Sequence, residues 1–467
     1  MHFTELVDLA SERLGGAVLV ANDEFFAPKE NLLKPSKPIF VEGKYTDLGK
    51  WMDGWETRRR RTPGHDWCIV RLGLAGIPRG VVVDTAHFKG NYPESCSIEA
   101  CAVAGGAGLE PLTTPVWTEI LPQSALKGDC ENLFSIDSNR RATHLRLNIY
   151  PDGGVARLRV HGEVEAILPY SGEIDLAAIE NGGLVVASSD MFFGSRQNLI
   201  MPGRAVNMSD GWETRRRRGP GHDWVIIQLG APGAIHEVEV DTSHFKGNYP
   251  DSCSLEACDG DGVPLGLVLP ETKLHAHTRH VFRDEIRDAG PMSYVRFNIF
   301  PDGGVSRLRL YGRRAAPAIT EAELLACCAS REWARRMAER QPYASAEEML
   351  ERADRTWWEL GPQDWLQAFA AHPRIGESSA DASASREQSG VEGAEAETLE
   401  RLAAGNREYE QRFGYIYIVC ATGKSAAQML SILQSRLNNP PDIELRVAAE
   451  QQRQIMRLRL EKWMNKL

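Results

Sequence analysis

Two sets of polar side chains recur at matching positions along the chain, and their types suit anion binding and acid–base chemistry. A guanidinium binds a carboxylate through two parallel hydrogen bonds, while imidazole and carboxylate groups exchange protons near neutral pH. Each set begins in an arginine run and ends in the motif D-T-x-H-F-K-G-N. The candidate residues are Arg58, Arg60, His65, Asp84, His87, Lys89 and Asn91, with the counterparts Arg215, Arg217, His222, Asp241, His244, Lys246 and Asn248.

The arginine runs allow two interpretations. They end the repeated string DGWETRRRR at Asp53–Arg61 and at Asp210–Arg218. In the structural interpretation, the arginines alternate between the two faces of a strand and pair with nearby acids. In the functional interpretation, a subset of them faces a cleft and grips an anion through two guanidinium nitrogens.

The elements that must position these residues are duplicated as well. Trp55 and Trp212 are 157 residues apart, and the motif V-D-T-x-H-F-K-G-N-Y-P keeps the same spacing, which indicates the tandem duplication of a whole domain. Apolar and polar residues alternate between PDGG and GNYP turns, a pattern typical of antiparallel strands. The predicted strands include Val81–Val83, Ser97–Ala100, Leu145–Ile149, Ala156–Val160, Glu237–Val240, Tyr294–Ile299 and Ser306–Leu310.

Two local features are predicted to have a structural role and no catalytic one. The PDGG turns at Asp152 and Asp302 are predicted to be structural, because proline presets φ and glycine takes a positive φ. The first copy carries about ten extra residues around Lys34–Tyr45, a stretch with proline and glycine in which a surface loop tolerates insertion.

The pattern becomes helical after Gly312. Thr320 with Glu323, and Ser345 with Glu348, are capping-box signatures ahead of helices. Residues 313–319 form a predicted linker. The expected fold class is multidomain, with two tandem all-β jelly-roll or β-sandwich domains followed by an all-α domain. The expected boundaries are residues 1–165, 166–315 and 316–467.

Composition limits the class of protein. The chain has 467 residues and a formal net charge of −10, so a general binder of nucleic acid or anionic membrane is not expected. The sequence contains no run of 18 apolar residues and no C-x-x-C motif. We therefore expect a cytoplasmic protein with reduced thiols. The repeated cysteines, Cys96 with Cys253 and Cys101 with Cys258, are predicted to be small buried apolar residues on a strand edge.

One histidine of the helical region is placed for chemistry. His372 ends the predicted helix Trp365–Ala371 and precedes Pro373, before which helical geometry must stop, so its ring is expected to point away from the helix. Residues 384–388, Ala-Ser-Arg-Glu-Gln, follow across a loop, and the apolar segment Tyr417–Ala421 is predicted to be extended. Taken singly, such a histidine is more often a cap or a surface residue, and a Glu-Gln pair is usually solvated.

Together these pieces resemble one family. His-Pro-x-x-Gly at His372, the pair Glu387-Gln388, Phe-Gly-x-x-x-Ile-Val-Cys-Ala from Phe413 and Leu-Arg-Leu at Leu458–Leu460 are the pattern of the 2-oxo-4-hydroxy-4-carboxy-5-ureidoimidazoline (OHCU) decarboxylases of urate degradation. The resemblance covers the last third of the chain. It implies an all-α enzyme without a cofactor that releases CO2 and yields (S)-allantoin. A ring C=N of the substrate supplies the electron sink, which leaves the protein to fix the carboxylate and to manage one proton.

The resemblance also implies roles for single residues. His372 acts as the acid or base, with Pro373 shaping its position. Tyr417 stands where the family more often has phenylalanine, and Arg459 contacts the substrate or a residue behind it, with a surface salt bridge as the alternative. The implied catalytic residues are His372 and Glu387, and the implied substrate-binding residues are Pro373, Ala384, Ser385, Arg386, Glu387, Gln388, Tyr417, Ile418, Val419, Cys420, Ala421 and Arg459.

The duplicated region resembles allantoicase over nearly all of residues 15–315. Both copies carry DGWETRRRR, GHDW and D-T-x-H-F-x-G-N-x-P. The resemblance implies twin jelly rolls that hydrolyse allantoate to ureidoglycolate and urea, in either copy or between the copies. Allantoate calls for a cation at its carboxylate, acceptors for its ureido N–H groups and an acid or base for C–N cleavage. A divalent metal is compatible with the histidines and aspartates, although no ligand spacing demands one.

Both resemblances fall in one degradation pathway. One module makes allantoin and the other consumes allantoate, so a separate enzyme must open the ring between the two steps. The alternative is a helical decarboxylase that carries twin non-catalytic ligand-binding β-sandwiches, because jelly rolls serve both purposes. The expected partners are the small-molecule substrates allantoate and OHCU, without nucleic acid or membrane, and a homo-oligomer is compatible with the sequence.

Overall fold

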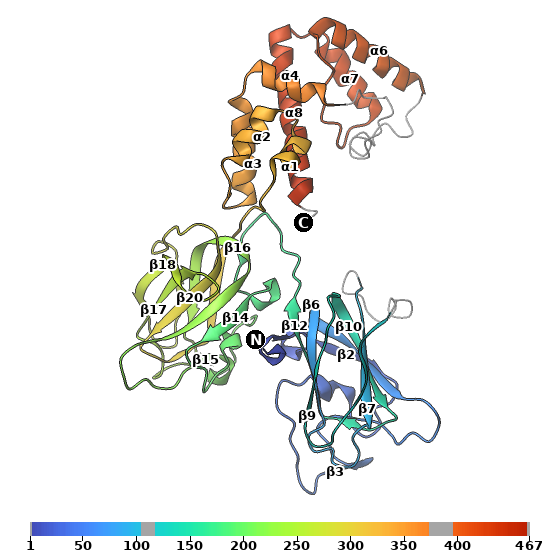
Figure 1. Cartoon of the computed structure of the whole chain (residues 1–467), viewed down its shortest axis with the longest axis vertical. Helices are drawn as coiled ribbons and strands as arrows, with labels where there is room; N and C mark the ends of the chain where they lie inside the picture. The colour runs from blue at the N-terminus through green and yellow to red at the C-terminus, as the bar shows by residue number, and fades with distance from the viewer. Residues whose placement is uncertain (1, 104–116, 373–395, 465–467) are drawn as a thin grey trace. The chain divides into compact units, whose positions relative to one another are not determined.

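The computed structural model describes residues 2–103, 117–372 and 396–464. The chain forms two compact units (Figure 1). The β unit comprises Met1–Pro169 with Glu173–Gly312, and the helical unit comprises Tyr170–Gly172 with Arg313–Leu467. The predicted fold class, two tandem all-β domains followed by an all-α domain, is confirmed. No helix among these residues combines the length and the apolar character needed to cross a membrane.

Each repeat of the β unit is built on a hydrogen-bonded network of eight strands. The first repeat contains β1 (Val7–Asp8), β2 (Ala17–Ala21), β3 (Tyr45–Thr46), β4 (Gly49–Lys50), β5 (Trp55–Glu56), β6 (Asp66–Asp84), β7 (Ser95–Cys101), β8 (Thr118–Ala125), β9 (Glu131–Ser135), β10 (Ala142–Tyr150), β11 (Gly154–Val155) and β12 (Arg157–Val164). The second repeat contains β13 (Ile174–Asp175), β14 (Leu184–Ser188), β15 (Trp212–Glu213), β16 (Asp223–Asp241), β17 (Ser252–Cys258), β18 (Pro264–Lys273), β19 (Arg279–Phe282), β20 (Met292–Phe300), β21 (Gly304–Val305) and β22 (Arg307–Arg314). Every predicted strand overlaps one of these.

One long strand in each repeat belongs to both layers of a sandwich. The first half of β6 pairs with β2 and β10, so that Val70 lies opposite Val18 and Leu145. Its second half pairs with β9 and β12, so that Val81 lies opposite Phe134 and Val160. In the second repeat, β16 connects β14 and β20 with β19 and β22 in the same way. The network therefore folds over on itself and encloses a core between its two layers.

The strand pattern places alternate residues in that core. Along β10, Leu145, Leu147 and Ile149 are fully buried, as period-two alternation requires. Cys96 and Cys253 are also buried apolar residues, as predicted. Their strands, β7 and β17, pair on both sides and are inner strands, so the prediction of a strand edge is wrong. Sequence alternation reports burial of one face but not the number of neighbouring strands.

The PDGG turns pack against the GNYP turns. Gly153 has φ 143°, and a Cβ atom there would lie 2.7 Å from the backbone nitrogen of Pro93, so only glycine allows this close approach. The carboxylate of Asp152 accepts a hydrogen bond from the backbone N–H of Arg60 at 2.8 Å. These contacts agree with the structural role predicted for the turn.

The ten-residue insertion of the first repeat lies in the loop that precedes β5. It carries the short strands β3 and β4, which pair only with each other. Tyr45 and Leu48 of this hairpin are exposed. The hairpin has no counterpart among the described strands of the second repeat. It begins where the predicted range Lys34–Tyr45 ends and extends beyond it to Lys50.

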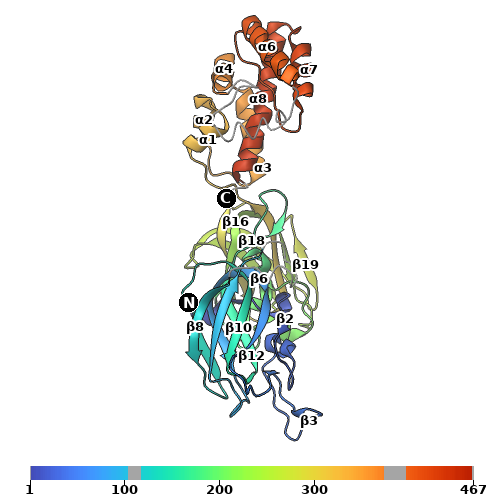
Figure 2. The same ribbon diagram turned by 90° about the vertical axis from the view of Figure 1, so that its right-hand side faces the viewer.

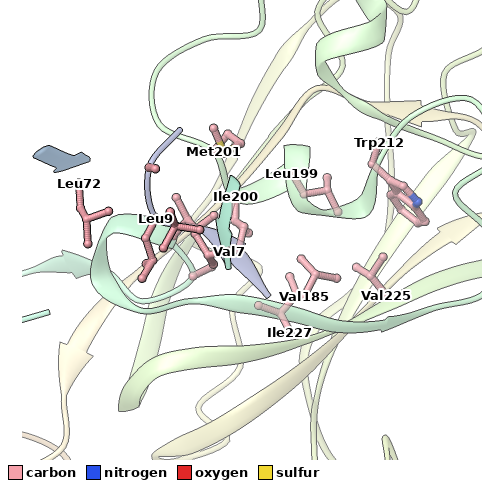
Figure 3. Packing of buried hydrophobic residues seen from close by; sticks show 14 of the residues in the cluster. Val7, Leu9, Leu72, Val185, Leu199, Ile200, Met201, Trp212, Val225 and Ile227 are labelled. Atoms are coloured by element: carbon pink, nitrogen blue, oxygen red, sulfur yellow. The ribbon is translucent and has the colours of Figure 1, made fainter. Parts of the chain in front are cut away.

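The two repeats share one buried hydrophobic cluster. Val7 and Leu9, from the start of the first repeat, belong to the same cluster as Leu199, Ile200 and Met201 of the second (Figure 3). All five side chains are nearly inaccessible to solvent. Because burial of apolar area is the main favourable contribution to folding, the repeats are packed parts of one unit.

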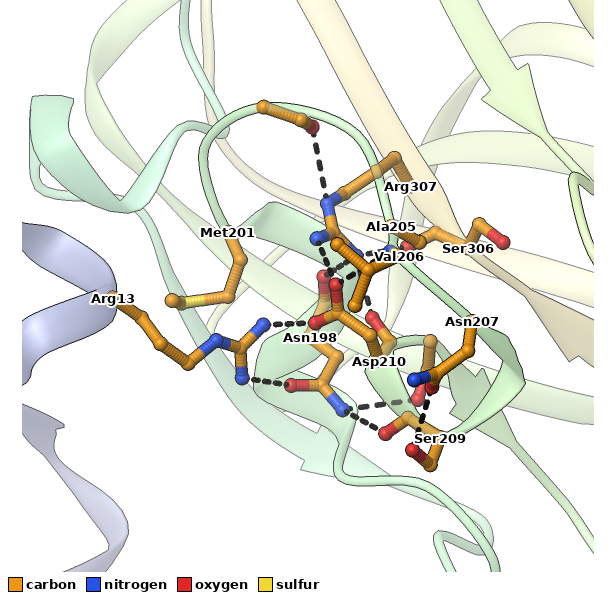
Figure 4. A network of polar contacts seen from close by, with 12 residues as sticks. Arg13, Asn198, Met201, Ala205, Val206, Asn207, Ser209, Asp210, Ser306 and Arg307 are labelled. Carbon is orange, nitrogen blue, oxygen red and sulfur yellow. Dashed lines mark hydrogen bonds and ion pairs between the residues drawn. The ribbon is translucent and has the colours of Figure 1, made fainter. Parts of the chain in front are cut away.

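An ion-pair network crosses the same interface. Arg13 of the first repeat pairs with Asp210 of the second, and Asp210 also binds the buried Arg307, Nη2 to Oδ2, at 3.0 Å (Figure 4). In the first repeat the equivalent Asp53 binds Arg157 at 2.7 Å within its own repeat. Both repeats therefore contain the same aspartate–arginine pair, and only the pair in the second repeat is also bound by Arg13 of the other repeat.

The helical unit contains seven helices among the described residues. They are α1 (Glu321–Cys327), α2 (Arg331–Ala338), α3 (Ala346–Trp358), α4 (Pro362–Ala370), α6 (Ala396–Phe413), α7 (Ala426–Arg436) and α8 (Pro441–Met464). Helix α8 runs along the unit, with α6 and α7 towards one end and α1 to α3 beside the other (Figure 1 and Figure 2). The buried Trp357 of α3 donates a hydrogen bond from Nε1 to the carbonyl of Ala449 in α8, at 2.9 Å.

The predicted helix starts are confirmed, with one difference. Thr320 and Glu323 form the full capping box, with side chain to backbone contacts in both directions. Ser345 accepts a hydrogen bond from the N–H of Glu348, but the Glu348 carboxylate binds the N–H of Ala344 instead of that of Ser345. The glutamate therefore satisfies an N–H group one residue earlier than a capping box would.

Candidate active sites

An open groove in the first repeat is lined by the whole arginine run. It lies between the loop after β2 and the segment between β5 and β6, and its volume is about 610 Å³. We call it the arginine groove, and its lining residues are Asn22, Asp23, Phe25, Phe26, Arg58, Arg59, Arg60, Arg61, Thr62 and Asp66. Four guanidiniums face two carboxylates, so the groove has a positive formal charge and favours anions.

Two of these arginines are held in ion pairs. The Nε atom of Arg58 binds Oδ2 of Asp23 at 2.7 Å, and Nη2 of Arg60 binds Oδ1 of the buried Asp66 at 2.6 Å. Burial raises the pKa of Asp23, but hydrogen bonds from the Phe25 N–H and from Arg58 outweigh it, so its pKa lies below the ordinary value. Arg58 and Arg60 thus pair with acids, as the structural interpretation predicts. The prediction that the run lies in a strand is wrong, because residues 58–61 lie between β5 and β6.

Arg59 and Arg61 are in a different situation. Both are exposed, and no hydrogen bond or ion pair joins either side chain to another described residue. The sequence analysis did not select them, because four adjacent arginines look alike until their partners are known. Arg58 pairs with Asp23, which is distant in sequence, and Arg60 pairs with Asp66, which follows a turn. The sequence near the run therefore does not show which arginines are paired and which are not.

The second repeat reproduces this framework. Arg215 binds Asp190 at 3.0 Å, and Arg217 pairs with the buried Asp223. Arg216 and Arg218 are exposed, without a side-chain partner in the part of the chain that the structure describes. In both repeats, therefore, the first and third arginines of the run are paired with aspartates, and the second and fourth are not.

The D-T-x-H-F-K-G-N segment forms a turn whose polar groups are largely occupied. Asp84 is buried and accepts a hydrogen bond from the N–H of Ala86 at 2.8 Å. His87 has φ 69°, its N–H donates to Asp129, and its Nε2 lies 3.3 Å from the carbonyl oxygen of Pro38. This histidine is fixed at both its backbone and its ring. None of the candidates in this segment lines the arginine groove.

The equivalent turn of the second repeat has the same contacts. Asp241 accepts a hydrogen bond from the N–H of Ser243, and Nε2 of His244 lies 2.9 Å from the carbonyl oxygen of Ala205. The lysines are the least constrained members of the two segments. Lys89 is mostly exposed and lies 3.8 Å from Asp129, and Lys246 is exposed.

Beside each of these turns lies a carboxylate that the sequence analysis missed. Glu56 is half-buried and accepts a hydrogen bond from Asn91 at 2.7 Å, and Asn248 binds Glu213 in the second repeat. Burial raises the pKa of Glu56, and the hydrogen bond from Asn91 opposes this only in part. A half-buried carboxyl group with a raised pKa is a candidate proton carrier. The sequence signal for both carboxylates is the glutamate that recurs in the two DGWET strings.

The two GHDW histidines lie against the β10 and β20 strands. His65 packs on Tyr150, with the ring centroids 4.7 Å apart. His222 packs on Phe300, and its Nε2 lies 3.1 Å from Oδ1 of Asn298. Neither histidine is placed in the arginine groove. Of the candidates in the first repeat, Arg58 and Arg60 line this groove and the others do not.

His280 is a histidine of the second repeat that must stay neutral to keep its contacts. Its Nε2 accepts a hydrogen bond from the N–H of His275 at 2.9 Å, while its Nδ1 lies 3.1 Å from the carbonyl oxygen of Val240. In the first repeat, Asn132 makes the same two contacts, to Lys127 and to Val83. Burial lowers the pKa of His280 below its usual 6.5.

Replacing His280 with asparagine, the residue at the equivalent position of the first repeat, is expected to make the β unit less sensitive to acid. Because the pKa is lower in the folded chain, the unfolded chain takes up the proton first, and stability is lost as the pH falls below 6.5. Urea unfolding between pH 7 and pH 5, measured for both proteins, checks this. The pKa of His144 is also lowered by burial, so a smaller loss should persist in the variant. An equal loss in both proteins contradicts the prediction.

In the helical unit, His372 follows α4, as predicted. It is half-buried, and its N–H donates to the carbonyl of Phe369 at 3.0 Å. Helix α4 ends at Ala370, so His372 lies outside the helix. The implied binding residues Pro373, Ala384, Ser385, Arg386, Glu387 and Gln388 lie outside the described residues.

Residues Tyr417–Ala421 form a segment without helix or strand, and the first four side chains are buried. Some of its backbone groups are occupied: Nη1 of Arg436 donates to the carbonyl of Ile418 at 2.7 Å, and the N–H of Cys420 donates to Gln451 at 3.0 Å. The backbone N–H and C=O of Val419 have no hydrogen-bond partner among the described residues. The backbone groups of Tyr417 also lack a partner in the described part of the chain, so Tyr417 and Val419 are the best placed of the five to offer backbone groups to a substrate.

A buried network holds this segment. Arg436 and Glu444 pair at 2.6 Å in the core, and both Tyr409 and Asn439 donate hydrogen bonds to the same carboxylate. Tyr417 stacks on Arg436, and burial raises the pKa of its hydroxyl to about 12. The hydroxyl of Tyr417 therefore stays protonated near neutral pH.

Arg459 lies on α8 and is half-buried. Its charge reaches the buried thiol of Cys328, whose pKa is raised to about 12 mainly by burial. Gln452, two helical turns before Arg459 on the same face, is fully buried and faces Cys328. A glutamine on the apolar face of an amphipathic helix is unusual, and this is the sequence signal for the buried Gln452.

The described residues contain neither a metal site nor a disulfide bond. No three His, Cys, Asp or Glu side chains there are placed to hold one metal ion. All nine cysteines are free thiols. Burial raises the pKa of the Cys96 and Cys253 thiols to about 12, which makes them poor nucleophiles.

Comparisons with known proteins give separate matches for the two units. A family model described as the allantoicase repeat matches residues 7–165 and 174–315, and one described as OHCU decarboxylase matches residues 314–461. A probable allantoicase of Burkholderia mallei is 50% identical over 319 residues, which cover 66% of this chain and 94% of that protein.

Two solved structures are similar to parts of this chain. The crystal structure of allantoicase from Saccharomyces cerevisiae is 40% identical, covers 66% of this chain and 92% of its own, and has a TM-score of 0.57. A crystal structure of OHCU decarboxylase in the presence of (S)-allantoin is 37% identical and covers 30% of this chain and 96% of its own, with a TM-score of 0.28.

Proposed function

The chain belongs to the allantoicase family and carries an OHCU decarboxylase domain, and we propose from this that it is a bifunctional enzyme of urate degradation. The β unit hydrolyses allantoate to ureidoglycolate and urea. The helical unit decarboxylates OHCU to (S)-allantoin. The observation that carries the assignment is the match of one family model to both β repeats and of a second to the helical unit.

Allantoate hydrolysis breaks one bond between the central carbon and a ureido nitrogen. Water supplies the hydroxyl group of ureidoglycolate, and the departing nitrogen takes up a proton to leave as urea. The reaction therefore needs a cation for the carboxylate and a group that transfers protons. The candidates for proton transfer are Glu56 and Glu213, which the structure adds, beside Asp84, His87, Asp241 and His244.

OHCU decarboxylation breaks the bond between the ring carbon and its carboxylate. The electron pair moves into the ring C=N, and a proton replaces CO2 on one face of the carbon to give the S enantiomer. We propose that His372 handles this proton, because an imidazole titrates near neutrality. Val419 offers its peptide groups and Arg459 its charge to the substrate, and Glu387 and Gln388 bind its polar groups. The reaction proceeds without a cofactor.

The deciding experiment is a urea assay on the full chain with allantoate, run with chelator and again with added divalent cations. Hydrolysis predicts steady release of urea with saturation kinetics. Binding of allantoate without urea under either condition supports the alternative of non-catalytic ligand-binding sandwiches. A requirement for added cation would assign a metal to the allantoate site, for which the sequence makes no demand.

Three further properties belong to this proposal. The proposed organisation is two repeats, residues 1–165 and 166–315, followed by the decarboxylase domain, residues 316–467. The protein is proposed to act in the cytoplasm on small molecules, as the reduced cysteines suggest. A homo-oligomer is compatible with the exposed apolar side chains of the first repeat, such as Ile39 and Tyr45.

A further inference from the structure

The arginine groove contains more positive charge than its own acids neutralise. Asp23 is taken by Arg58 and Asp66 by Arg60. The two remaining guanidiniums open onto the groove, and no other carboxylate lines it. A cavity with two uncompensated cations attracts an anion and lowers the cost of bringing it out of water.

The backbone around these guanidiniums is fixed on both sides. The N–H of Arg58 donates to Asp23 at 3.0 Å, and the N–H of Arg60 donates to Asp152 at 2.8 Å. Arg59 therefore lies between two anchored residues. Anchoring of this kind reduces the conformational entropy that a side chain loses when it binds a ligand, which distinguishes the groove from an ordinary charged surface.

The second repeat anchors its run in the same way. The N–H of Arg215 donates to Asp190 at 2.7 Å, and the N–H of Arg217 donates to Asp302 at 2.8 Å. Arg216 lies between them. Two runs that diverged in many neighbouring residues have thus kept the same pair of backbone anchors and the same two unpaired positions.

Aromatic rings lie against the paired guanidiniums of the two arginine runs. The guanidinium of Arg58 lies over Phe25 at 5.1 Å, and Phe25 meets Phe26 edge to face. Arg215 lies over Phe192 at 5.2 Å in the second repeat. Phe25 and Phe192 are exposed. Flat amide or ureido groups stack on such faces, so the site combines a carboxylate-binding end with a surface for planar arms.

We propose that Arg59 with Arg61, and Arg216 with Arg218, bind the carboxylate of the hydrolysed substrate, which gives the chain two carboxylate sites, one in each repeat. The inference rests on the proposed hydrolysis of allantoate. It assigns binding to residues that flank Arg58 and Arg60 and leaves those two with the structural task of holding the run in place. The ligand class is a small carboxylate that bears planar ureido arms.

The test uses the full chain and compares three alanine variants: R59A/R61A, R216A/R218A and the quadruple change. Each double variant is expected to keep about half of the urea-forming rate, because one repeat remains intact. The quadruple variant is expected to raise the KM for allantoate by about tenfold to a hundredfold, the effect of losing a charge-assisted hydrogen bond. The variant R204A/R287A removes two exposed arginines of the same unit outside the groove, and it should retain the wild-type KM.

Salt dependence supplies a readout that a folding defect does not move. The wild-type KM for allantoate should rise between 0.05 and 0.5 M salt, estimated from the roughly threefold shortening of the screening length over this range, and the quadruple variant should lose this rise. The urea-unfolding transition of the β unit, whose core contains the buried Trp55 and Trp212, reports whether each variant is folded. A quadruple variant with the wild-type KM overturns the inference, and so does a double variant that abolishes urea release. Absence of urea from the wild type would instead overturn the proposed function.

Discussion

The H372N variant is expected to release CO2 from OHCU about 10²- to 10⁴-fold more slowly than the wild type, which is the usual contribution of a positioned acid or base. Asparagine is close to histidine in size and forms hydrogen bonds, but it does not exchange a proton near neutral pH. His372 lies just outside α4 and is half-buried, so the exchange leaves the helix and the core of the unit intact. The rate of CO2 release under saturating substrate is the measurement.

The same preparation carries its own control for this experiment. Urea release from allantoate should match the wild type, because its candidate residues lie in the β unit. A matched variant is H236N, since His236 is a partly exposed histidine of the second repeat that pairs with Glu173. It should leave both rates unchanged. Wild-type CO2 release by H372N would remove the histidine from the mechanism.

The E444A variant is expected to destabilise the helical unit by about 3–5 kcal/mol, the cost of leaving one member of a buried ion pair without its partner. Glu444 is fully inaccessible to solvent and accepts hydrogen bonds from Arg436, Tyr409 and Asn439. Its removal leaves a buried guanidinium uncompensated. The free energy of unfolding, followed through the tryptophans of this unit, measures the loss.

The same change should weaken decarboxylation before it unfolds the unit. Arg436 holds the carbonyl of Ile418, so loss of its partner loosens the segment in which Val419 is proposed to contact the substrate. The control is E339A, which breaks an exposed pair with Arg335 and should cost less than about 1 kcal/mol. Equal stability of the two variants would contradict the account of the buried network.

The strands and helices of this protein follow from local sequence patterns. Leu145, Leu147 and Ile149 alternate in the sequence and are buried together in β10. Thr320 and Glu323 predict a helix start that the structure contains in full. These features depend on neighbours in sequence, so sequence alone predicts them. The position of β7 inside the sheet depends on which strands pair, and the prediction of an edge failed there.

The candidate sites were predictable only as sets of residue types. Arg58 and Arg59 are adjacent and chemically identical. Asp23, 35 residues before Arg58, forms an ion pair with Arg58 but not with Arg59. His87 looked suited to acid–base chemistry, yet its ring is held by the carbonyl of Pro38 and its backbone by Asp129. Partners that are distant in sequence decide whether a polar group is free for substrate, and no local pattern encodes them.

The two proposed reactions are not consecutive, since allantoin must be opened to allantoate between them. The fusion therefore fixes the ratio of two enzymes of one pathway without passing a product directly from one site to the other. This organisation predicts that each substrate yields only its own product on the purified chain.

The most direct test gives the purified full-length chain OHCU in one reaction and allantoate in another, and quantifies CO2 and urea in both. We expect CO2 and (S)-allantoin without urea from OHCU, and urea without CO2 from allantoate. Failure of either substrate to give its product, or urea formed from OHCU alone, would contradict the assignment of two independent sites to this chain.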